Sequence, residues 1–224
     1  MITSEDEARA FIEQRAADGA TGDSAFVAME RLGQLIAALM AENEQQNLIS
    51  RGSVEFIWSR HLADSAQLLD HVPRETLVGG AFAAKPWLDL GVGAGFPGLV
   101  IAALRPQMPV ILVESRARRV EWLERIVSEL ALEHCRVVGS KLELIDSFEA
   151  SVISARAFAP LGKLLKLSAR FSTSGTYWVL PKGRKAAQEV GELPRPLRKM
   201  FHVEQSQTDA EAGIIVGKGR VSKV

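Results

Sequence analysis

The sequence predicts an α/β fold in which a seven-stranded, mostly parallel sheet follows an N-terminal helical extension. After Pro73, short apolar runs alternate with stretches of helical periodicity, a pattern typical of a parallel sheet covered by helices on both faces. The last two predicted strands have no helix between them, so we expect them to form an antiparallel hairpin. A length of 224 residues suits one such domain with a modest extension.

The helical extension is expected to occupy residues 1–72 and the α/β core residues 73–224, together forming one compact unit. Apolar residues recur at helical spacing in the extension, at Phe26, Met29, Leu32, Ile36, Leu39 and Met40. Ser53 is the predicted N-cap of a second helical stretch. The residues that this stretch is expected to bury are Ile57, Leu62, Ser65, Leu68 and Leu69.

The core contains seven predicted strands and four predicted helices. The strands are Trp87–Leu90, Val110–Glu114, Arg136–Gly139, Ser151–Ser154, Thr176–Leu180, Lys199–Glu204 and Gly213–Gly217. The helices are Gly98–Arg105, Arg118–Leu132, Leu161–Arg170 and Arg184–Val190.

Charge is unevenly distributed along the chain, although the formal net charge is zero. Residues 1–50 carry 3 Lys or Arg against 9 Asp or Glu, whereas residues 51–224 carry 24 against 18. A neutral total argues against a nucleic-acid partner, but this segregation weakens that argument. A solvated acidic helix and a functional asymmetry explain the pattern equally well.

The cysteine count and the first residues indicate a cytoplasmic protein that does not enter a membrane. The single cysteine, Cys135, excludes an intramolecular disulfide and is expected to be buried. The N-terminus is acidic and shows no signal peptide, and the apolar patch at 35–40 is too short to span a bilayer.

A glycine-rich turn follows the first predicted strand. Asp89 lies between Leu88 and Leu90, and glycines then occupy positions 91, 93 and 95. Glycine permits positive φ and leaves no Cβ between backbone and ligand, and Pro97 suits the first turn of a helix. A strand, a glycine turn and a helix N-terminus together admit a nucleotide-like ligand.

Two acidic residues narrow the choice of ligand. Glu114 ends the second strand about 20 residues after the loop, where a carboxylate accepts hydrogen bonds from ribose hydroxyls; alternatively, it caps the helix that starts near Arg116. Asp89, just before the glycines, suits a cationic ligand and repels a pyrophosphate, which favours S-adenosylmethionine over a nicotinamide cofactor. Asp89 also suits a bracing role as an acceptor of backbone N–H bonds, and the two roles are compatible.

Several motifs, in order, resemble the small-subunit ribosomal RNA methyltransferase G family, also called glucose-inhibited division protein B. The resemblance runs from about residue 26 to the C-terminus. Its central motif is the loop Asp-x-Gly-x-Gly-x-Gly-x-Pro-Gly at 89–98. The other matching stretches are Asn47-Leu48, Arg60–Ser65, Leu112–Ser115, Arg118–Leu123, Ser154–Ala159 and Pro181–Gly183.

The resemblance implies a class I S-adenosylmethionine-dependent methyltransferase with a Rossmann-like sheet. Its reaction is methyl transfer to N7 of a guanine in 16S rRNA near the decoding centre. The implied partner is 16S rRNA or the small ribosomal subunit, and we expect a monomer. The expected cofactor-binding residues, from the motif and the resemblance together, are Asp89, Gly91, Gly93, Gly95, Phe96, Glu114, Leu142, Glu143 and Arg156.

The expected RNA-binding residues combine this resemblance with the positions of basic side chains. They are Arg60, His61, Arg118, Arg119, Lys182 and Arg184. Lys182 and Arg184 follow the carboxyl end of a strand, the edge at which ligands bind in such sheets. Each basic group also has the simpler interpretation of a solvated face. The chain departs from the family in having Lys141 where an arginine is usual and Ala155 where a serine is frequent.

Methyl transfer to guanine N7 needs no general base, because N7 carries a lone pair and no proton. A carboxylate nearby would stabilise the positive charge that appears on the guanine. The candidates for a catalytic role are Asp64 and Arg156, although Asp64 is equally well explained as a partner of Arg60 one helical turn away. The four histidines show no metal-ligand spacing, so we expect no metal.

Two other functional classes fit parts of the sequence. A nicotinamide-dependent oxidoreductase would need a second catalytic domain, for which the chain is short, and a Tyr/Lys or His/Asp set, whereas the single tyrosine is Tyr177 in a predicted strand. A cofactor-binding regulatory protein without catalysis is disfavoured by the intact glycine loop and the basic strand edge.

Overall fold

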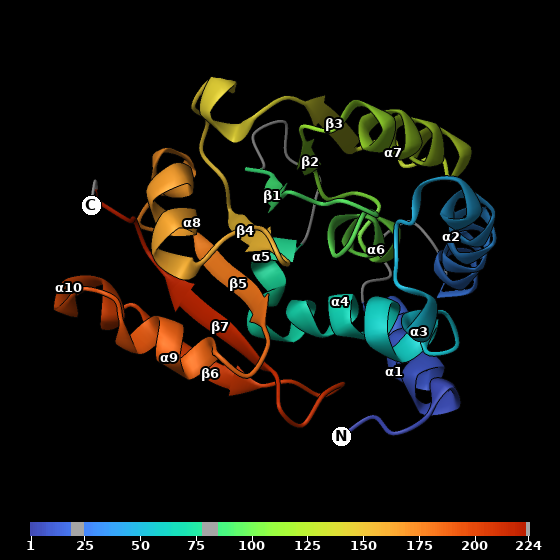
Figure 1. Ribbon diagram of the computed structural model, residues 1–224, viewed down its shortest axis with the longest axis horizontal. Coiled ribbons are helices and arrows are strands. Elements are labelled where there is room, and N and C mark those ends of the chain that lie inside the picture. Colours follow the sequence, from blue (N-terminus) through green and yellow to red (C-terminus); the bar gives the residue numbers. More distant parts are fainter. Residues whose placement is uncertain (19–24, 78–84, 223–224) are drawn as a thin grey trace.

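The computed structural model describes residues 1–18, 25–77 and 85–222. It contains the predicted α/β fold, a seven-stranded sheet in the order β3-β2-β1-β4-β5-β7-β6 (Figure 1). The strands are β1 (Trp87–Leu90), β2 (Val110–Glu114), β3 (Cys135–Gly139), β4 (Val152–Ala155), β5 (Tyr177–Lys182), β6 (Phe201–Gln205) and β7 (Gly213–Lys218).

Strands β1 to β5 are parallel, and β7 runs antiparallel to both β5 and β6, which confirms the predicted hairpin. The chain moves outward from β1 to β3 and then returns to β4 on the other side of β1. The carboxyl ends of β1 and β4 therefore flank a topological switch point, where loops diverge and leave a crevice for ligands.

Helices cover both faces of the sheet, as Figure 1 shows. One face carries α6 (Gly98–Leu104) and α7 (Ala117–Glu129), with α1 (Glu5–Asp18) and α2 (Ala25–Gln46) outside them. The other face carries α8 (Leu161–Ser168), α9 (Ala186–Gly191), α10 (Arg195–Arg198) and the 3₁₀ turns η3 (Leu142–Leu144) and η4 (Ala169–Phe171). No helix in the described part of the chain is long and apolar enough to cross a membrane.

The central strands are buried because each contributes side chains to two cores. In β1, Trp87 packs with the α6 side and Leu88 and Leu90 pack with the α8 side. This alternation follows from the two-residue period of a strand. Cys135, the first residue of β3, is buried as predicted, and burial raises the pKa of its thiol to about 12.

The segment 51–77 forms a chain of short helical turns instead of one regular helix. These are α3 (Arg51–Val54), the π-helical η1 (Trp58–Ala63), α4 (Asp64–Ala66), the 3₁₀ η2 (Gln67–His71) and α5 (Arg74–Leu77). All five residues predicted to be buried here are buried. The predicted N-cap role of Ser53 is wrong, because Ser53 lies within α3 and its hydroxyl donates to the Ser50 carbonyl.

The predicted apolar stripe of α2 is partly wrong. Leu32 and Leu39 are buried, but Phe26 is 76% exposed and Met40 is 37% exposed. The buried stripe is Ala28, Leu32, Leu35, Leu39 and Glu42, with spacings of four and three residues. Phe26 and Met40 are apolar residues that fall outside this helical face.

In the core, the predicted strands and helices differ from the structure by boundary shifts of at most three residues, whereas α10 and η3 lie where no helix was predicted. Helix α7 ends at Glu129, and Ala131 then takes a positive φ. Strand β6 begins at Phe201 because α10 occupies the four residues before Lys199. The division into residues 1–72 and 73–224 stays a prediction.

We expect Leu39→Ala to lower the free energy of unfolding by about 2–5 kcal/mol, because it opens a cavity in the core beside the sheet. Met40→Ala, on the neighbouring exposed position, should change it by less than about 1 kcal/mol. Urea unfolding followed by circular dichroism measures both. If the extension folds separately from the sheet, Leu39→Ala will instead split the transition into two steps.

Candidate functional site

Three hollows open around the carboxyl ends of the parallel strands. The Glu114 hollow, of about 420 Å³, is lined by Gly91, Glu114, Arg116, Arg119, Ser140, Lys141, Leu142, Glu143 and Phe158 with their neighbours. The His61 hollow, of about 430 Å³, is lined by Ser53, Arg60, His61, Gly93, Phe96, Arg119 and Arg156 with their neighbours. The Lys182 hollow, of about 620 Å³, is lined by Arg60, Asp64, Arg156, Phe158, Pro160, Pro181, Lys182, Glu189 and Thr208 with their neighbours.

The three hollows meet at Ala157, which lines all of them. Ala157 follows β4 and has a φ of +54°, in the left-handed region that residues with a Cβ rarely adopt. Such backbone conformations concentrate at functional sites. The loop after β4 is therefore the point at which ligands in neighbouring hollows would approach each other.

A buried network centred on Asp89 joins β1, β4 and the start of α6. Asp89 Oδ2 accepts the Gly98 N–H at 2.7 Å, and Oδ1 accepts the Ser154 hydroxyl at 2.7 Å. The Ser154 Oγ in turn accepts the Trp87 indole N–H at 2.7 Å. Asp89 has no exposed surface and lines none of the three hollows. Of its two predicted roles, the geometry supports bracing the loop.

Burial makes Asp89 an unusual carboxyl group. It raises the pKa of Asp89 to about 7, although the hydrogen bonds from Ser154 and Gly98 act in the opposite direction. A carboxyl that is half protonated near neutral pH contributes less charge to the site than the sequence suggests.

Glu114 holds the glycine loop from the end of β2. Its Oε2 accepts the Gly93 N–H at 3.0 Å, and its Oε1 accepts the N–H groups of Ser115 at 2.7 Å and Arg116 at 2.9 Å. A carboxylate has about four acceptor positions, so about one remains toward the Glu114 hollow. Glu114 thus accepts the N–H groups of the two residues before α7, and it also lines a hollow.

The three loop glycines occupy positive φ but differ in their surroundings. Their φ values are +64° for Gly91, +57° for Gly93 and +111° for Gly95. A Cβ on Gly91 would lie 2.5 Å from the Phe158 ring, and one on Gly93 would lie 3.0 Å from the Arg119 guanidinium. Gly95 packs against Leu99 and lines none of the hollows, so only the first two glycines reach the ligand side.

His61 and Phe96 form one wall of the His61 hollow. Their rings stack with centroids 5.1 Å apart and an interplanar angle of 19°. Arg156 Nη2 lies 3.2 Å from His61 Nδ1, and Ser53 Oγ lies 3.0 Å from Nε2. Burial, with the nearby charge of Arg156, lowers the pKa of His61 to about 4. A neutral His61 therefore accepts from Arg156 through Nδ1 and donates to Ser53 through Nε2.

Asp64 is held by an ion pair with Arg156, at 3.3 Å between Oδ2 and Nη1. Arg156, and not the alternative partner Arg60, is thus the arginine that pairs with Asp64, and the Arg60 carbonyl also accepts from Arg156 at 3.3 Å. The other Asp64 oxygen accepts the Thr208 hydroxyl and the Gln67 amide, each at 2.9 Å. The two candidate catalytic residues therefore lie together at the edge of the Lys182 hollow.

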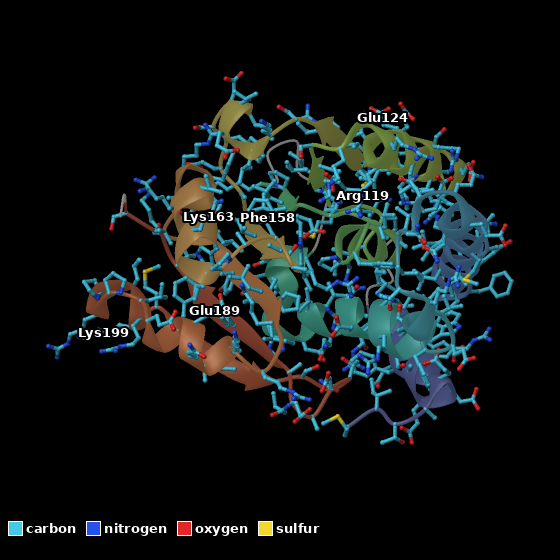
Figure 2. All side chains as sticks on the ribbon, in the orientation of Figure 1. Arg119, Glu124, Phe158, Lys163, Glu189 and Lys199 are labelled. Atoms are coloured by element: carbon cyan, nitrogen blue, oxygen red, sulfur yellow. The ribbon has the colours of Figure 1, made fainter. Side chains whose placement is uncertain are left out.

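The expected RNA-binding residues separate into two groups. Four of them line the hollows: Arg60, His61, Arg119 and Lys182. Arg119, labelled in Figure 2, lies on α7, and its guanidinium is close to Gly93. Arg118 reaches the Gln45 carbonyl at 3.4 Å, and Arg184 pairs with Glu211; neither lines a hollow. Among the described residues no group of three or more His, Cys, Asp or Glu is placed to hold a metal ion.

Sequence reasoning missed Phe158, Glu189 and Thr208 as lining residues. Phe158 lies in the Arg-Ala-Phe motif, so its position beside Arg156 was a usable signal. Glu189 lies within a predicted helix and Thr208 in a polar loop, and neither has a motif of its own. Thr208 reaches Asp64 across 144 residues of chain, which local patterns do not reveal.

Comparison with known proteins decides the family. A family model described as rRNA small subunit methyltransferase G matches residues 28–213. The chain belongs to this family. The ribosomal RNA small subunit methyltransferase G of Erythrobacter litoralis is 59% identical over 98% of this chain and 99% of its own length. That of Sphingopyxis alaskensis is 49% identical over 94% of this chain and 88% of its own length.

Solved structures with the same fold include S-adenosylmethionine-binding proteins. A mutant of MtNAS in complex with S-adenosylmethionine has a TM-score of 0.52 at 15% identity, covering 96% of this chain and 89% of its own. A precorrin-6y C5,15-methyltransferase from Geobacter metallireducens has a TM-score of 0.51 at 12% identity, covering 79% of this chain and 92% of its own. These neighbours confirm the class I methyltransferase fold. Family membership decides against an oxidoreductase and a regulatory protein without catalysis.

The raised pKa of Asp89 predicts a pH-dependent stability. The folded protein retains the Asp89 proton to about pH 7, whereas an unfolded chain releases it near the ordinary value of 3.8. The stabilisation from protonated Asp89 is therefore complete below about pH 4 and is lost as pH rises through about 7. Asp89→Asn keeps the size of the side chain but removes this titration.

We expect the stability difference between the native protein and Asp89→Asn to fall by up to about 1.4 kcal/mol for each pH unit between about pH 4 and pH 7. Urea unfolding of both proteins across this range measures it. Parallel stability curves would show that Asp89 is ionised in the folded protein throughout.

Proposed function

We propose that this chain transfers the methyl group of S-adenosylmethionine to N7 of a guanine in the 16S rRNA of the small ribosomal subunit. The observation that carries the proposal is the meeting of three hollows at Ala157, beside the glycine loop and the Glu114 carboxylate. When bound, S-adenosylmethionine supplies a methyl group activated by a sulfonium. The residues present fit such a ligand, with a carboxylate acceptor, apolar walls and basic groups in adjoining hollows.

The Glu114 hollow suits the adenosine part of the cofactor. Glu114 offers its remaining acceptor position to a ribose hydroxyl, while its other bonds keep the loop in place. Leu142 provides an apolar surface for a purine, and Ser140 and Lys141 provide polar atoms at its rim. Glu143 lines the same hollow, as the family resemblance implies.

The His61 hollow suits the amino-acid part of the cofactor. Arg60, Arg119 and Arg156 all line it, and a guanidinium binds a carboxylate in bidentate fashion. Phe96 and His61 form a flat wall beside them. Because His61 is neutral, it adds no positive charge next to a sulfonium.

The Lys182 hollow suits the target guanine. Residues here need to orient N7 toward Ala157 and to stabilise the charge that appears on the guanine, since no proton has to be removed. Asp64 is the carboxylate placed for this, and Arg156 holds it in position. In this proposal Asp64 is the catalytic residue and Arg156 positions it while also lining the His61 hollow.

The rRNA backbone would approach from the crevice side. Arg60 and Lys182 line the Lys182 hollow. Arg118 and Arg184 lie outside the hollows, and we assign these two cations to rRNA phosphates. A ribosomal RNA substrate supports a cytoplasmic location.

The test is to incubate the protein with labelled S-adenosylmethionine and either small ribosomal subunits or naked 16S rRNA, and then map the label. We expect the label at N7 of one guanine. Calorimetry should show S-adenosylmethionine binding and no NADH binding. Methylation of a protein or small molecule with rRNA untouched would overturn the RNA assignment.

We expect Glu114→Ala and Gly93→Asp to abolish S-adenosylmethionine binding in calorimetry. The first removes the acceptor that fixes the loop, and the second places a side chain and a negative charge where φ is +57°. Glu124→Ala, at an exposed glutamate on the following helix α7 (Figure 2), is the control and should bind normally. Normal S-adenosylmethionine affinity in both site variants would show that the cofactor does not bind at this loop.

We expect Asp64→Asn to reduce kcat for rRNA methylation by about 10–100-fold, because a neutral amide no longer offsets the charge on the guanine. S-adenosylmethionine affinity should change by less than about threefold. Asp70→Asn is the control, since Asp70 pairs with Arg15 and lines none of the hollows. An unchanged kcat in Asp64→Asn would leave Asp64 as a structural partner of Arg156 only.

A further inference from the structure

We propose that Glu189 recognises the Watson–Crick edge of the target guanine and thereby determines which base is methylated. This inference rests on the proposed function and concerns the Lys182 hollow. Glu189 lies on α9 (Figure 2). It lines this hollow together with Lys182 from the end of β5. None of the motifs in the sequence includes it.

The Lys182 hollow has the volume and the lining residues that a base-binding site needs. Its volume is about 620 Å³, the largest of the three at the crevice. Phe158, Pro160 and Pro181 give it flat apolar walls, on which a purine ring stacks. Enzymes that modify a base within folded RNA take it out of the stack into such a pocket and read its hydrogen-bonding edge there.

Two anchors from different elements hold the Glu189 carboxylate. Its Oε2 accepts the backbone N–H of Leu161 at 2.6 Å and the Lys182 ammonium at 2.9 Å. The side chain is 20% exposed, and no hydrogen bond to its Oε1 is present among the described residues. One carboxylate oxygen is thus fixed by the protein while the other remains for a ligand in the hollow.

Lys182 is oriented in the same way. Its ammonium donates to the Ala159 carbonyl at 2.8 Å and to Glu189, which uses two of its three donors. The third donor remains for an acceptor. The hollow therefore presents a fixed acceptor and a fixed donor side by side, on residues that keep each other in place.

This pairing complements guanine. The Watson–Crick edge of guanine carries two donors, N1–H and the N2 amino group, with the O6 acceptor next to them. Glu189 Oε1 accepts from the donors and the Lys182 ammonium donates to O6. Adenine presents an acceptor at N1, which a carboxylate repels. N7 lies at the opposite end of the purine, so a guanine held by Glu189 directs N7 away from it, toward Ala157.

The competing explanation is that Glu189 and Lys182 form an ion pair with a structural role only. Glu189→Gln separates the two explanations, because the Gln carbonyl oxygen still accepts from Leu161 and Lys182. Its amide N–H₂ then takes the place of Oε1 and faces the guanine donors. If Glu189 has a structural role only, the Glu189→Gln variant keeps its activity on guanine. If Glu189 recognises guanine, the variant loses this activity.

The experiment compares RNA fragments with guanine or inosine at the target position, since inosine differs from guanine only in lacking the N2 amino group. For the native enzyme we expect kcat/KM to fall at least about fivefold with inosine. For Glu189→Gln we expect kcat/KM with guanine to fall about 10–100-fold, and the guanine-to-inosine ratio to approach one. Glu192→Gln, an exposed neighbour after α9, is the matched control and should keep native values.

Calorimetry with S-adenosylmethionine and thermal unfolding accompany each variant and should match the native protein. A native enzyme that methylates inosine as fast as guanine overturns the proposal without any variant. A Glu189→Gln enzyme that keeps the native guanine-to-inosine ratio also overturns it. If the native enzyme binds no S-adenosylmethionine or leaves rRNA unmethylated, the proposed function itself fails, which is a separate result.

Discussion

The Asp89 carboxyl is the constraint on which the rest of the site depends. Its two oxygens fix the first N–H of α6 and the Ser154 hydroxyl on β4, so that β1, β4 and the helix that follows β1 hold one geometry. Because Asp89 is buried, these bonds are shielded from competition with water. The glycine loop, the loop after β4 and their hollows all start from strands that this network joins.

Much of the fold was predictable because buried parallel strands carry a strong local signal. The bounds of β1 and β2 match the prediction residue for residue, since both are short apolar runs ended by glycine or an acidic residue. The extension was harder. Phe26 and Met40 are apolar yet exposed, and contacts with α1, α6 and α7 decide which side of α2 is buried. The π-helical turn η1 breaks a stretch whose sequence suggests one helix.

In the site, too, residues marked by local sequence patterns were predictable, whereas contacts between distant parts of the chain were not. Glu114 was predictable because the residue that ends β2 and the loop it holds are both marked by sequence. The pairing of Asp64 with Arg156 was not, because it joins the extension to the loop after β4 across 92 residues. Thr208 and Glu189 line the Lys182 hollow from the β6–β7 loop and from α9. Tertiary packing brings them there, and no periodic pattern in the sequence indicates it. Family motifs marked Arg156, Asp64 and Lys182, but they revealed neither the pairing of Asp64 with Arg156 nor the role of Glu189 as the partner of Lys182.

Because guanine N7 carries no proton, the site does not have to provide a general base. No group has to titrate during the reaction, so the chain can use its carboxyl groups to hold geometry. Asp89, Glu114 and Glu189 each accept at least one backbone N–H, from a helix start or from the glycine loop. His61 is likewise kept neutral between Arg156 and Ser53. In the proposed mechanism, catalysis depends on alignment at Ala157, and the backbone N–H groups that Asp89, Glu114 and Glu189 accept help to hold the loops that produce this alignment.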